Sequence, residues 1–217
     1  MQFLIDLESI DIAIEHLVVA GWTGRDDAMV QHHIDELAAL GVAPPSSTPL
    51  FYQVSNDLLT QASDIQVLGP ATSGEAEPFL VNHTGKMWLG LASDHTDRNL
   101  EATSVAASKQ ACAKICAPKL WDFSQIEDHL DQLRLRSWIK EGAEWELYQD
   151  GNFAQILPLT TLRSRIEKID CAAMLCGTLP VIGGVRGAAE FRADLYDPVT
   201  EQRIKLQYRA VCLNIVS

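Results

Sequence analysis

Residues 75–94 read EAEPFLVNHTGKMWLGLASD and carry the clearest structural signal in the chain. Two apolar runs, PFLV at 78–81 and MWLGLA at 87–92, flank a polar segment that contains Gly85. Apolar runs of this length around turn residues predict two neighbouring strands joined by a hairpin. Strand-like patterns recur on both sides of this stretch, and helix-like patterns interrupt them irregularly. We therefore predict an α+β fold.

The remaining elements are assigned from periodicity and turn residues. Asp26 or Asp27 can begin a helix with apolar residues at helical spacing, and Gly41 ends it. Further helices are predicted at 123–133 and 159–169. The other predicted strands are two short ones within 2–20, one at 64–69, a set within 136–153 around Gly142 and Gly151, and a hairpin within 191–216 that turns at Asp197-Pro198.

Length, charge and cysteine usage limit the class of protein. The 217 residues are 47% hydrophobic, which is enough for one buried core, so we predict a single domain over residues 1–217. A net charge of −12 argues against binding to nucleic acid or anionic lipid. No apolar run is long enough to span a bilayer, and the N-terminus does not resemble a secretory signal. Five cysteines without zinc-knuckle spacing indicate free thiols in the cytoplasm.

Glu75 and Glu77 stand at the start of the predicted hairpin. Side chains two residues apart in a strand project from one face, so these carboxylates would repel each other without compensation. A hard divalent cation such as Mg²⁺, Mn²⁺ or Ca²⁺ supplies that compensation. Asp94, one hairpin later, offers a third ligand, with Asp97 in reserve. The alternative is that one glutamate simply faces solvent at the edge of a sheet.

Five short motifs occur in one order along the chain. They are GR followed by HHIDE, then EAE, DHTDR, SKQ and CGTLP, at residues 24–36, 75–77, 94–98, 108–110 and 176–180. This order resembles the signature of the fumarylacetoacetate hydrolase superfamily, and the likeness extends over about residues 20–200. The chain also resembles a small bacterial family of unknown function that is affiliated with this superfamily.

The resemblance implies a mixed β-sandwich or roll of the fumarylacetoacetase C-terminal type, with flanking helices, assembled as a homodimer. It implies that Glu75, Glu77 and Asp94 hold one Mg²⁺ or Mn²⁺ ion. The other implied site residues are Lys109 in catalysis, Arg98, Gly177 and Thr178 in substrate binding, and the pair His33 and Glu36 in activating water or moving a proton. From their spacing alone, this pair shares one face of a helix, and without the resemblance the favoured reading is that both are simply solvated helix residues.

Two positions depart from the superfamily pattern. Glu101 stands where a glutamine is usual after Arg98, and Gln53 stands where a lysine is common. We assign both residues to substrate binding. Because both positions have lost positive character, the predicted substrate is less anionic than the usual dicarboxylate.

The predicted function is that of a metal-dependent enzyme that acts on a small-molecule oxo acid, such as an acylpyruvate. We expect a metal-stabilised enolate and, as the outcome, hydrolysis of a C–C bond or decarboxylation. Isomerisation and hydration are the alternatives within the same superfamily. A different class of function is a non-catalytic protein that binds a small molecule or a partner on the same scaffold.

Overall fold

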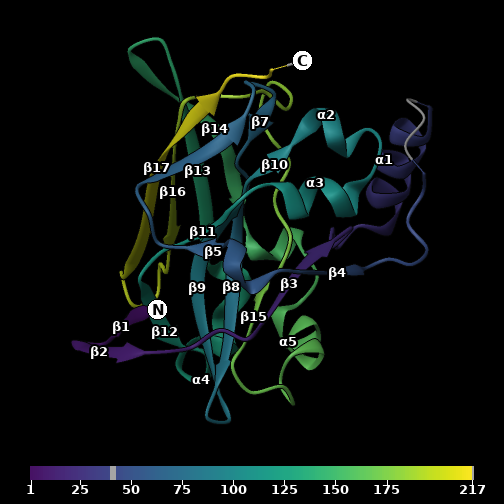
Figure 1. The fold of residues 1–217 in the computed structure, drawn as a ribbon. Helices are drawn as coiled ribbons and strands as arrows, with labels where there is room; N and C mark the ends of the chain where they lie inside the picture. Colours follow the sequence, from purple (N-terminus) through teal and green to yellow (C-terminus); the bar gives the residue numbers. More distant parts are fainter. Residues whose placement is uncertain (40–42, 217) are drawn as a thin grey trace.

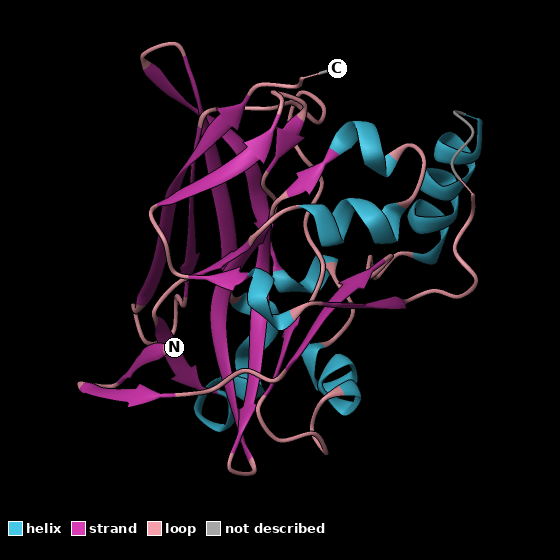
Figure 2. Cartoon of the chain, in the orientation of Figure 1, coloured by secondary structure: helices cyan, strands magenta, loops and turns pink. Residues whose placement is uncertain are grey.

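The computed structural model describes residues 1–39 and 43–216, without the side chains of residues 36 and 37. Strands dominate the described chain. Two large sheets pack against each other, and the helices lie outside them (Figures 1 and 2). The predicted α+β class is confirmed.

The larger sheet has ten strands: β1 (Gln2–Ile5), β2 (Glu8–Asp11), β3 (His16–Gly21), β4 (Leu50–Val54), β5 (Leu59–Thr60), β8 (Ala76–His83), β9 (Lys86–Asp94), β11 (Lys114–Cys116), β12 (Lys119–Asp122) and β15 (Ala172–Leu175). Eight of them follow the order β2-β1-β12-β9-β8-β15-β3-β4. β11 also pairs with β9, and β5 pairs with β11. Parallel and antiparallel pairs are mixed, since β1 with β12 and β15 with β3 are parallel.

The smaller sheet has five strands: β6 (Asp64–Leu68), β13 (Arg134–Glu141), β14 (Glu144–Asn152), β16 (Glu190–Tyr196) and β17 (Arg203–Leu213). Their order is β14-β13-β16-β17-β6, and only the pairing of β17 with β6 is parallel. A third, two-stranded ladder joins β7 (Thr72–Ser73) to β10 (Thr96–Asp97).

The α-helices are α1 (Asp27–Ala39), α2 (Arg98–Glu101), α3 (Val105–Ala111), α4 (Phe123–Ile126) and α5 (Leu159–Leu162), and the 3-10 helices are η1 (Asn56–Leu58), η2 (Glu127–Gln132), η3 (Phe153–Gln155) and η4 (Arg163–Arg165). In Figure 1, α1, α2 and α3 gather on one side of the sheets. Asp26 begins α1, because its Oδ1 accepts hydrogen bonds from the N–H groups of Ala28 and Met29 at 2.9 and 3.1 Å. Gly41, the predicted end of this helix, lies outside the described residues.

Several predicted elements differ from the observed ones. Residues 2–20 contribute three strands rather than two. Gly151 lies inside β14, so the hairpin turns only at Gly142, where φ is +63°. The helices predicted at 123–133 and 159–169 are broken into short α and 3-10 turns. Packing explains the break, because most apolar side chains of these segments are buried in the core, and tertiary contacts override helical propensity.

The β8–β9 hairpin separates two hydrophobic cores. Leu80 and Leu89 pack in the core between the two large sheets, while Phe79 and Val81 pack on the opposite face of the larger sheet. β8 is therefore buried on both faces, which accounts for its continuous apolar run. Strand alternation directs Glu77 to the same face as Phe79, and this placement fixes the position of the site.

Candidate active site

Three carboxylates meet at the open end of the β8–β9 hairpin. The register pairs Glu77 with Ala92, and continuing it sets Glu75 opposite Asp94. The Asp94 N–H donates to the Glu75 carbonyl at 3.0 Å, which extends this pairing. One carboxylate oxygen from each of Glu75, Glu77 and Asp94 lies within 4.8 Å of the others. The structure thus brings the three predicted metal ligands together.

Asp94 is fully buried between two lysines. Its Oδ2 contacts Lys109 Nζ, and its Oδ1 lies 2.7 Å from Lys114 Nζ. Burial raises the pKa of Asp94, but the two ammonium groups outweigh burial and hold this pKa well below the usual range. Lys114 Nζ also donates to the His95 carbonyl at 2.8 Å. Asp94 therefore stays ionised, and Lys114 is a site residue that the motifs did not predict.

Lys109 is held as a cation by the carboxylates around it. Burial lowers its pKa, but Asp94 foremost, and then Glu77 and Glu75, raise it above the ordinary value. Lys109 Nζ lies 5.7 Å from the centroid of the Tyr52 ring, a cation–π contact. A lysine in this state offers positive charge to a substrate and does not act as a base.

Glu77 is the carboxylate whose charge the protein compensates least. It is 2% exposed, and its Oε2 accepts a hydrogen bond from the Gly177 N–H at 2.7 Å. Burial raises the pKa of Glu77, and the negative charge of Asp94 raises the same pKa further. These two effects outweigh the opposite effects of Lys109 and the Gly177 N–H, so the pKa of Glu77 lies well above its ordinary value. A bound cation would favour the ionised form of this group.

The contribution of Glu77 to the stability of the cation-free protein is expected to fall as the pH rises above the usual pKa of a glutamate, about 4.3. In this range the folded protein binds a proton at Glu77 that the unfolded chain has released, so the Glu77 contribution to the free energy of unfolding falls, by at most about 1.4 kcal/mol per pH unit. The measurement is Tm against pH in EDTA for the wild type and Glu77→Gln. Identical profiles for the two proteins would contradict the raised pKa.

Arg98 joins the outer carboxylates. Its Nη2 lies 3.1 Å from Glu75 Oε1, its Nη1 donates to Glu101 Oε2 at 2.8 Å, and its Nε donates to Ser73 Oγ at 2.7 Å. Burial lowers the pKa of Arg98, but Glu75 and Glu101 outweigh burial and raise it. Glu101, a predicted substrate contact, is thus already paired with Arg98. Asp97, the reserve ligand, caps α2 instead.

The loop at 176–180 is tied to β8 through a buried amide. Thr178 Oγ1 donates to the Ala76 carbonyl at 2.7 Å and accepts from Gln149 Nε2 at 2.6 Å. The Ala76 N–H in turn donates to Gln149 Oε1 at 2.9 Å. Gln149 therefore links the residue between the two glutamates to the loop that holds Glu77, a role that the sequence did not reveal. Substrate binding by Thr178 stays a prediction.

Gly177→Ala is expected to destabilise the protein and weaken cation binding. Gly177 has a φ of +91°, and an added Cβ would lie 1.7 Å from Thr23 Oγ1, so the loop must move and withdraw its N–H from Glu77. We expect a loss of about 1–3 kcal/mol in the free energy of unfolding, measured by urea denaturation. Gly85→Ala is the matched control, because Gly85 also has a positive φ but open space around it. Equal losses in both variants would contradict the steric argument.

His95 supports the site from the other face of the sheet. Its Nδ1 lies 2.8 Å from Tyr208 Oη and its Nε2 lies 2.9 Å from Thr72 Oγ1. Burial, and then the charge of Lys114, lower the pKa of His95 to about 3, so the ring is neutral. Ser93 Oγ lies 2.9 Å from the same tyrosine oxygen. The side chain points away from the carboxylates, as strand alternation predicts.

A pocket of about 350 Å³ lies beside the lysine that contacts Asp94. Its lining comprises Trp22, Ala43, Pro44, Pro45, Ser46, Leu50, Tyr52, Thr103, Ser104, Val105 and Ala106. Lys109 Nζ lies over the Tyr52 ring, so Tyr52 joins the pocket to the acid cluster. The carboxylates themselves are not among the lining residues described.

Of the predicted catalytic pair, His33 and Glu36, only the side chain of His33 can be placed relative to this pocket. His33 is on α1, with its ring 5.8 Å from the ring of Trp22, whose Nε1 donates to Tyr52 Oη at 3.2 Å. The side chain of Glu36 is outside the described part of the structure. Gln53 is exposed on β4, and strand alternation directs it to the face opposite Tyr52. The structure therefore does not bring Gln53 to the pocket.

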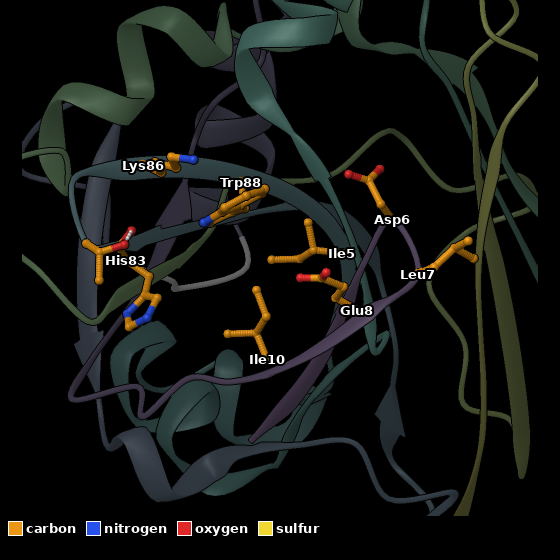
Figure 3. Close-up of a pocket in the computed structure, with 9 residues that line it drawn as sticks. Ile5, Asp6, Leu7, Glu8, Ile10, His83, Lys86 and Trp88 are labelled. Atoms are coloured by element: carbon orange, nitrogen blue, oxygen red, sulfur yellow. Dashed lines mark hydrogen bonds between the residues drawn. The ribbon is translucent and has the colours of Figure 1, made fainter.

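A larger pocket of about 610 Å³ lies at the other end of the β8–β9 hairpin, beside its turn (Figure 3). Its lining comprises Ile5, Asp6, Leu7, Glu8, Ile10, His83, Thr84, Lys86 and Trp88. The acid cluster is at the open end of the hairpin, so size alone does not identify the active site here.

The donor atoms of the acid cluster fit a hard divalent cation. Mg²⁺ and Mn²⁺ prefer oxygen ligands, and three carboxylates supply them. Asp94 Oδ1 is buried and makes no hydrogen bond of acceptable geometry with the described residues, although Lys114 Nζ lies close to it. Glu77, whose buried carboxyl group the surrounding groups compensate least, is the position at which a cation would complete the site.

Solved structures share this fold at low sequence identity. Cg1458 is 15% identical, with a TM-score of 0.64, and the match covers 93% of this chain and 78% of that chain. 2-Keto-3-deoxy-D-arabinonate dehydratase, complexed with magnesium and 2,5-dioxopentanoate, is 13% identical, with a TM-score of 0.63 and coverage of 96% and 76%. 5-Carboxymethyl-2-hydroxymuconate delta-isomerase from Mycobacterium smegmatis is 14% identical, with a TM-score of 0.62 and coverage of 93% and 80%. The fold is that of the fumarylacetoacetate hydrolase superfamily, as the motif order predicted.

Within this fold, the chain belongs to the DUF2848 family of proteins of unknown function, whose model matches residues 20–208. That range agrees with the extent of the likeness expected from the motifs. A search of the curated proteins gave no significant match. Among the described residues, no helix is both long and apolar enough to cross a membrane.

Proposed function

We propose that this protein is an enzyme that acts on an oxo acid with Mg²⁺ or Mn²⁺ held by Glu75, Glu77 and Asp94. The observation that carries the proposal is the convergence of three carboxylate oxygens within 4.8 Å, beside two lysines. A bound divalent ion supplies Lewis-acid stabilisation of negative charge on substrate oxygens. The magnesium in the complex of the structurally similar dehydratase supports the choice of ion.

Lys109 and Arg98 bind and orient the anionic part of the substrate in this proposal. Lys109 remains protonated, so it stabilises negative charge that develops during the reaction and does not remove a proton. Asp94 holds Lys109 in place through one carboxylate oxygen, and Lys114 pairs with the other oxygen of Asp94. Gly177 fixes the carboxylate of Glu77 through its N–H, while the backbone N–H of the neighbouring Thr178 is the proposed contact for the substrate carboxylate, because the Thr178 hydroxyl already donates to the Ala76 carbonyl.

The charge balance of the site favours a substrate with one negative charge. The site has four carboxylates and three cationic side chains: Glu75, Glu77, Asp94 and Glu101, against Arg98, Lys109 and Lys114. A divalent ion leaves one net positive charge, which one carboxylate neutralises. Glu101 also occupies one Nη of Arg98, so a second substrate carboxylate would meet an acid there. We therefore propose a monocarboxylic oxo acid.

We propose hydrolysis of a C–C bond or decarboxylation as the reaction, with His33 and Glu36 in transfer of a proton to or from water. The position of His33 beside Trp22 and the 350 Å³ pocket supports this role. Isomerisation or dehydration is the second candidate. It is favoured by the names of two structural neighbours, an isomerase and a dehydratase.

A panel of acylpyruvates, oxaloacetate and 2-keto-3-deoxy sugar acids, each with Mg²⁺ and Mn²⁺ and followed by NMR, tests the proposal. Cleaved or decarboxylated products support the first reaction class, and a shifted double bond or lost water supports the second. A preference for oxaloacetate, the dicarboxylate of the panel, would contradict the proposal of a substrate with one carboxylate. A cation-dependent rise in Tm without turnover of any compound would support a non-catalytic binding protein.

We also propose that the chain works as a homodimer in the cytoplasm. Apolar side chains are exposed along the edge formed by β6 and β17, namely Leu68, Val211 and Leu213. Burial of this edge in a second copy would remove them from water. The five unpaired cysteines fit a reducing compartment. Light scattering after size exclusion should give twice the chain mass, and a monomer mass would contradict the dimer.

A further inference from the structure

A second cluster of metal-ligating side chains lies at the turn of the β8–β9 hairpin. β15 pairs antiparallel with β8, with Ala172 opposite Asn82, so continuing the register sets Cys171 opposite His83. Asp170 precedes this cysteine. One ligating atom from each of His83, Asp170 and Cys171 lies within 4.8 Å of the others. The turn is at the end of the hairpin remote from the acid cluster, so the two groups are distinct.

The distances in this second cluster suit a small tetrahedral ion. Cys171 Sγ lies 4.0 Å from His83 Nδ1. With Zn–S and Zn–N bonds of roughly 2.3 and 2.0 Å, a tetrahedral ion sets sulfur and nitrogen about 3.5 Å apart, so a small side-chain adjustment suffices. Asp170 Oδ1 accepts the Thr84 N–H at 2.7 Å, and the Cys171 carbonyl accepts the Glu15 N–H at 2.8 Å. The backbone that carries these ligands is therefore anchored to both neighbouring segments.

The 610 Å³ pocket adjoins this cluster through His83 (Figure 3). The register of β8 and β9 places His83, Lys86 and Trp88 on one face of the hairpin. Trp88 is only 8% exposed, and its Nε1 has no hydrogen-bond partner among the described residues. A buried donor left unsatisfied beside a pocket indicates a polar ligand or water there. Asp6 and Glu8 add two negative charges to the same pocket, and Lys86 adds one positive charge.

We propose that His83, Asp170 and Cys171 bind Zn²⁺, with a fourth coordination position open toward this pocket. A nitrogen, oxygen and sulfur ligand set suits a borderline transition-metal ion, whereas Mg²⁺ requires oxygen ligands. Glu15 places further negative charge near the Cys171 thiol. The ion ties the hairpin turn to the start of β15. The proposal does not depend on the function of the acid cluster.

Co²⁺ titration of tag-free reduced protein, with excess Mg²⁺ present, tests the site. Co²⁺ is the probe because thiolate ligation gives a charge-transfer band in the near ultraviolet and tetrahedral geometry gives intense visible bands. We expect one equivalent of Co²⁺ to produce both features and Zn²⁺ to abolish them by displacement. Cys171→Ser should lose the charge-transfer band, and Cys171→Ser and His83→Ala should each weaken Co²⁺ binding by at least about tenfold.

Cys212→Ser is the matched control, because Cys212 is an exposed thiol remote from the hairpin turn. It should keep the full spectrum, and circular dichroism checks that every variant is folded. The proposal is overturned if wild-type protein gives no charge-transfer band, if the band survives in Cys171→Ser, or if Cys212→Ser removes it.

Discussion

Glu77→Gln is expected to keep the fold but to lose cation-dependent stabilisation and activity. The glutamine has the same shape, and its amide oxygen can still accept the hydrogen bond from the Gly177 N–H. It cannot balance the charge of a divalent ion. We expect Mg²⁺ affinity and kcat/KM to fall by at least about 100-fold, since groups that merely orient metal ligands already contribute 10- to 100-fold.

The same substitution should leave the cation-free protein at least as stable as the wild type near neutral pH, because it removes a buried carboxylate that is costly to ionise. The measurements are Tm in EDTA and in Mg²⁺, and turnover of the substrate found in the panel. Glu190→Gln is the matched control, since Glu190 pairs with Lys140 on the smaller sheet, and it should retain both properties. A full Mg²⁺ shift in Glu77→Gln would show that Glu77 is not a ligand.

Asp94→Asn is expected to be strongly destabilising, by on the order of 3–5 kcal/mol, the usual cost of removing one partner from a buried ion pair. Asp94 is fully buried and neutralises Lys109 and Lys114. The asparagine carries no charge, so both ammonium groups would stay in the interior without their common counter-charge. Among the residues that the structure describes, Lys114 would then keep only its hydrogen bond to the His95 carbonyl.

Urea denaturation measures this loss, with the midpoint and the m value recorded separately so that a change in the unfolded state is recognised. Asp150→Asn is the control for the same chemical change, because Asp150 pairs with the exposed Arg134. Exposed pairs contribute about 0–1 kcal/mol, so the control should remain close to wild type. Similar losses in the two variants would mean that Asp94 does not compensate the buried lysines.

The core of the site followed from strand geometry that the sequence displays. The apolar runs around Gly85 defined the hairpin, and the spacing of Glu75 and Glu77 placed both on one face. Asp94 ends the second strand, so a short turn returns it beside them. Local patterns suffice here because a two-stranded antiparallel unit fixes its own register.

Other site residues depend on contacts that sequence spacing does not encode. Gln149 comes from the smaller sheet, and its amide reaches β8 only because the two sheets pack together. Lys114 did leave a signal, since a lysine inside the apolar run AKICA is costly to bury and calls for a partner. Gln53 lies away from the 350 Å³ pocket because its neighbour Tyr52, one residue away on β4, takes the face toward Lys109, and its role in substrate binding stays a prediction.

The predicted helix at 159–169 also depends on tertiary contacts that sequence spacing does not encode. Residues 159–169 have helical periodicity, but the chain needs Leu159, Leu162 and Ile166 in the core, and it breaks into two short turns to bury them. Helix propensity is a weak preference that packing readily overrides.

We propose that Glu75, Glu77 and Asp94 together hold one divalent cation. Diffraction from crystals grown with Mn²⁺, recorded where manganese scatters anomalously, tests it most directly. We expect one strong anomalous peak at roughly 2.0–2.3 Å from an oxygen of each carboxylate, the range for hard divalent ions of this size. A map without a peak there, with Lys109 still in contact with Asp94 and the three carboxylates turned apart, would contradict it.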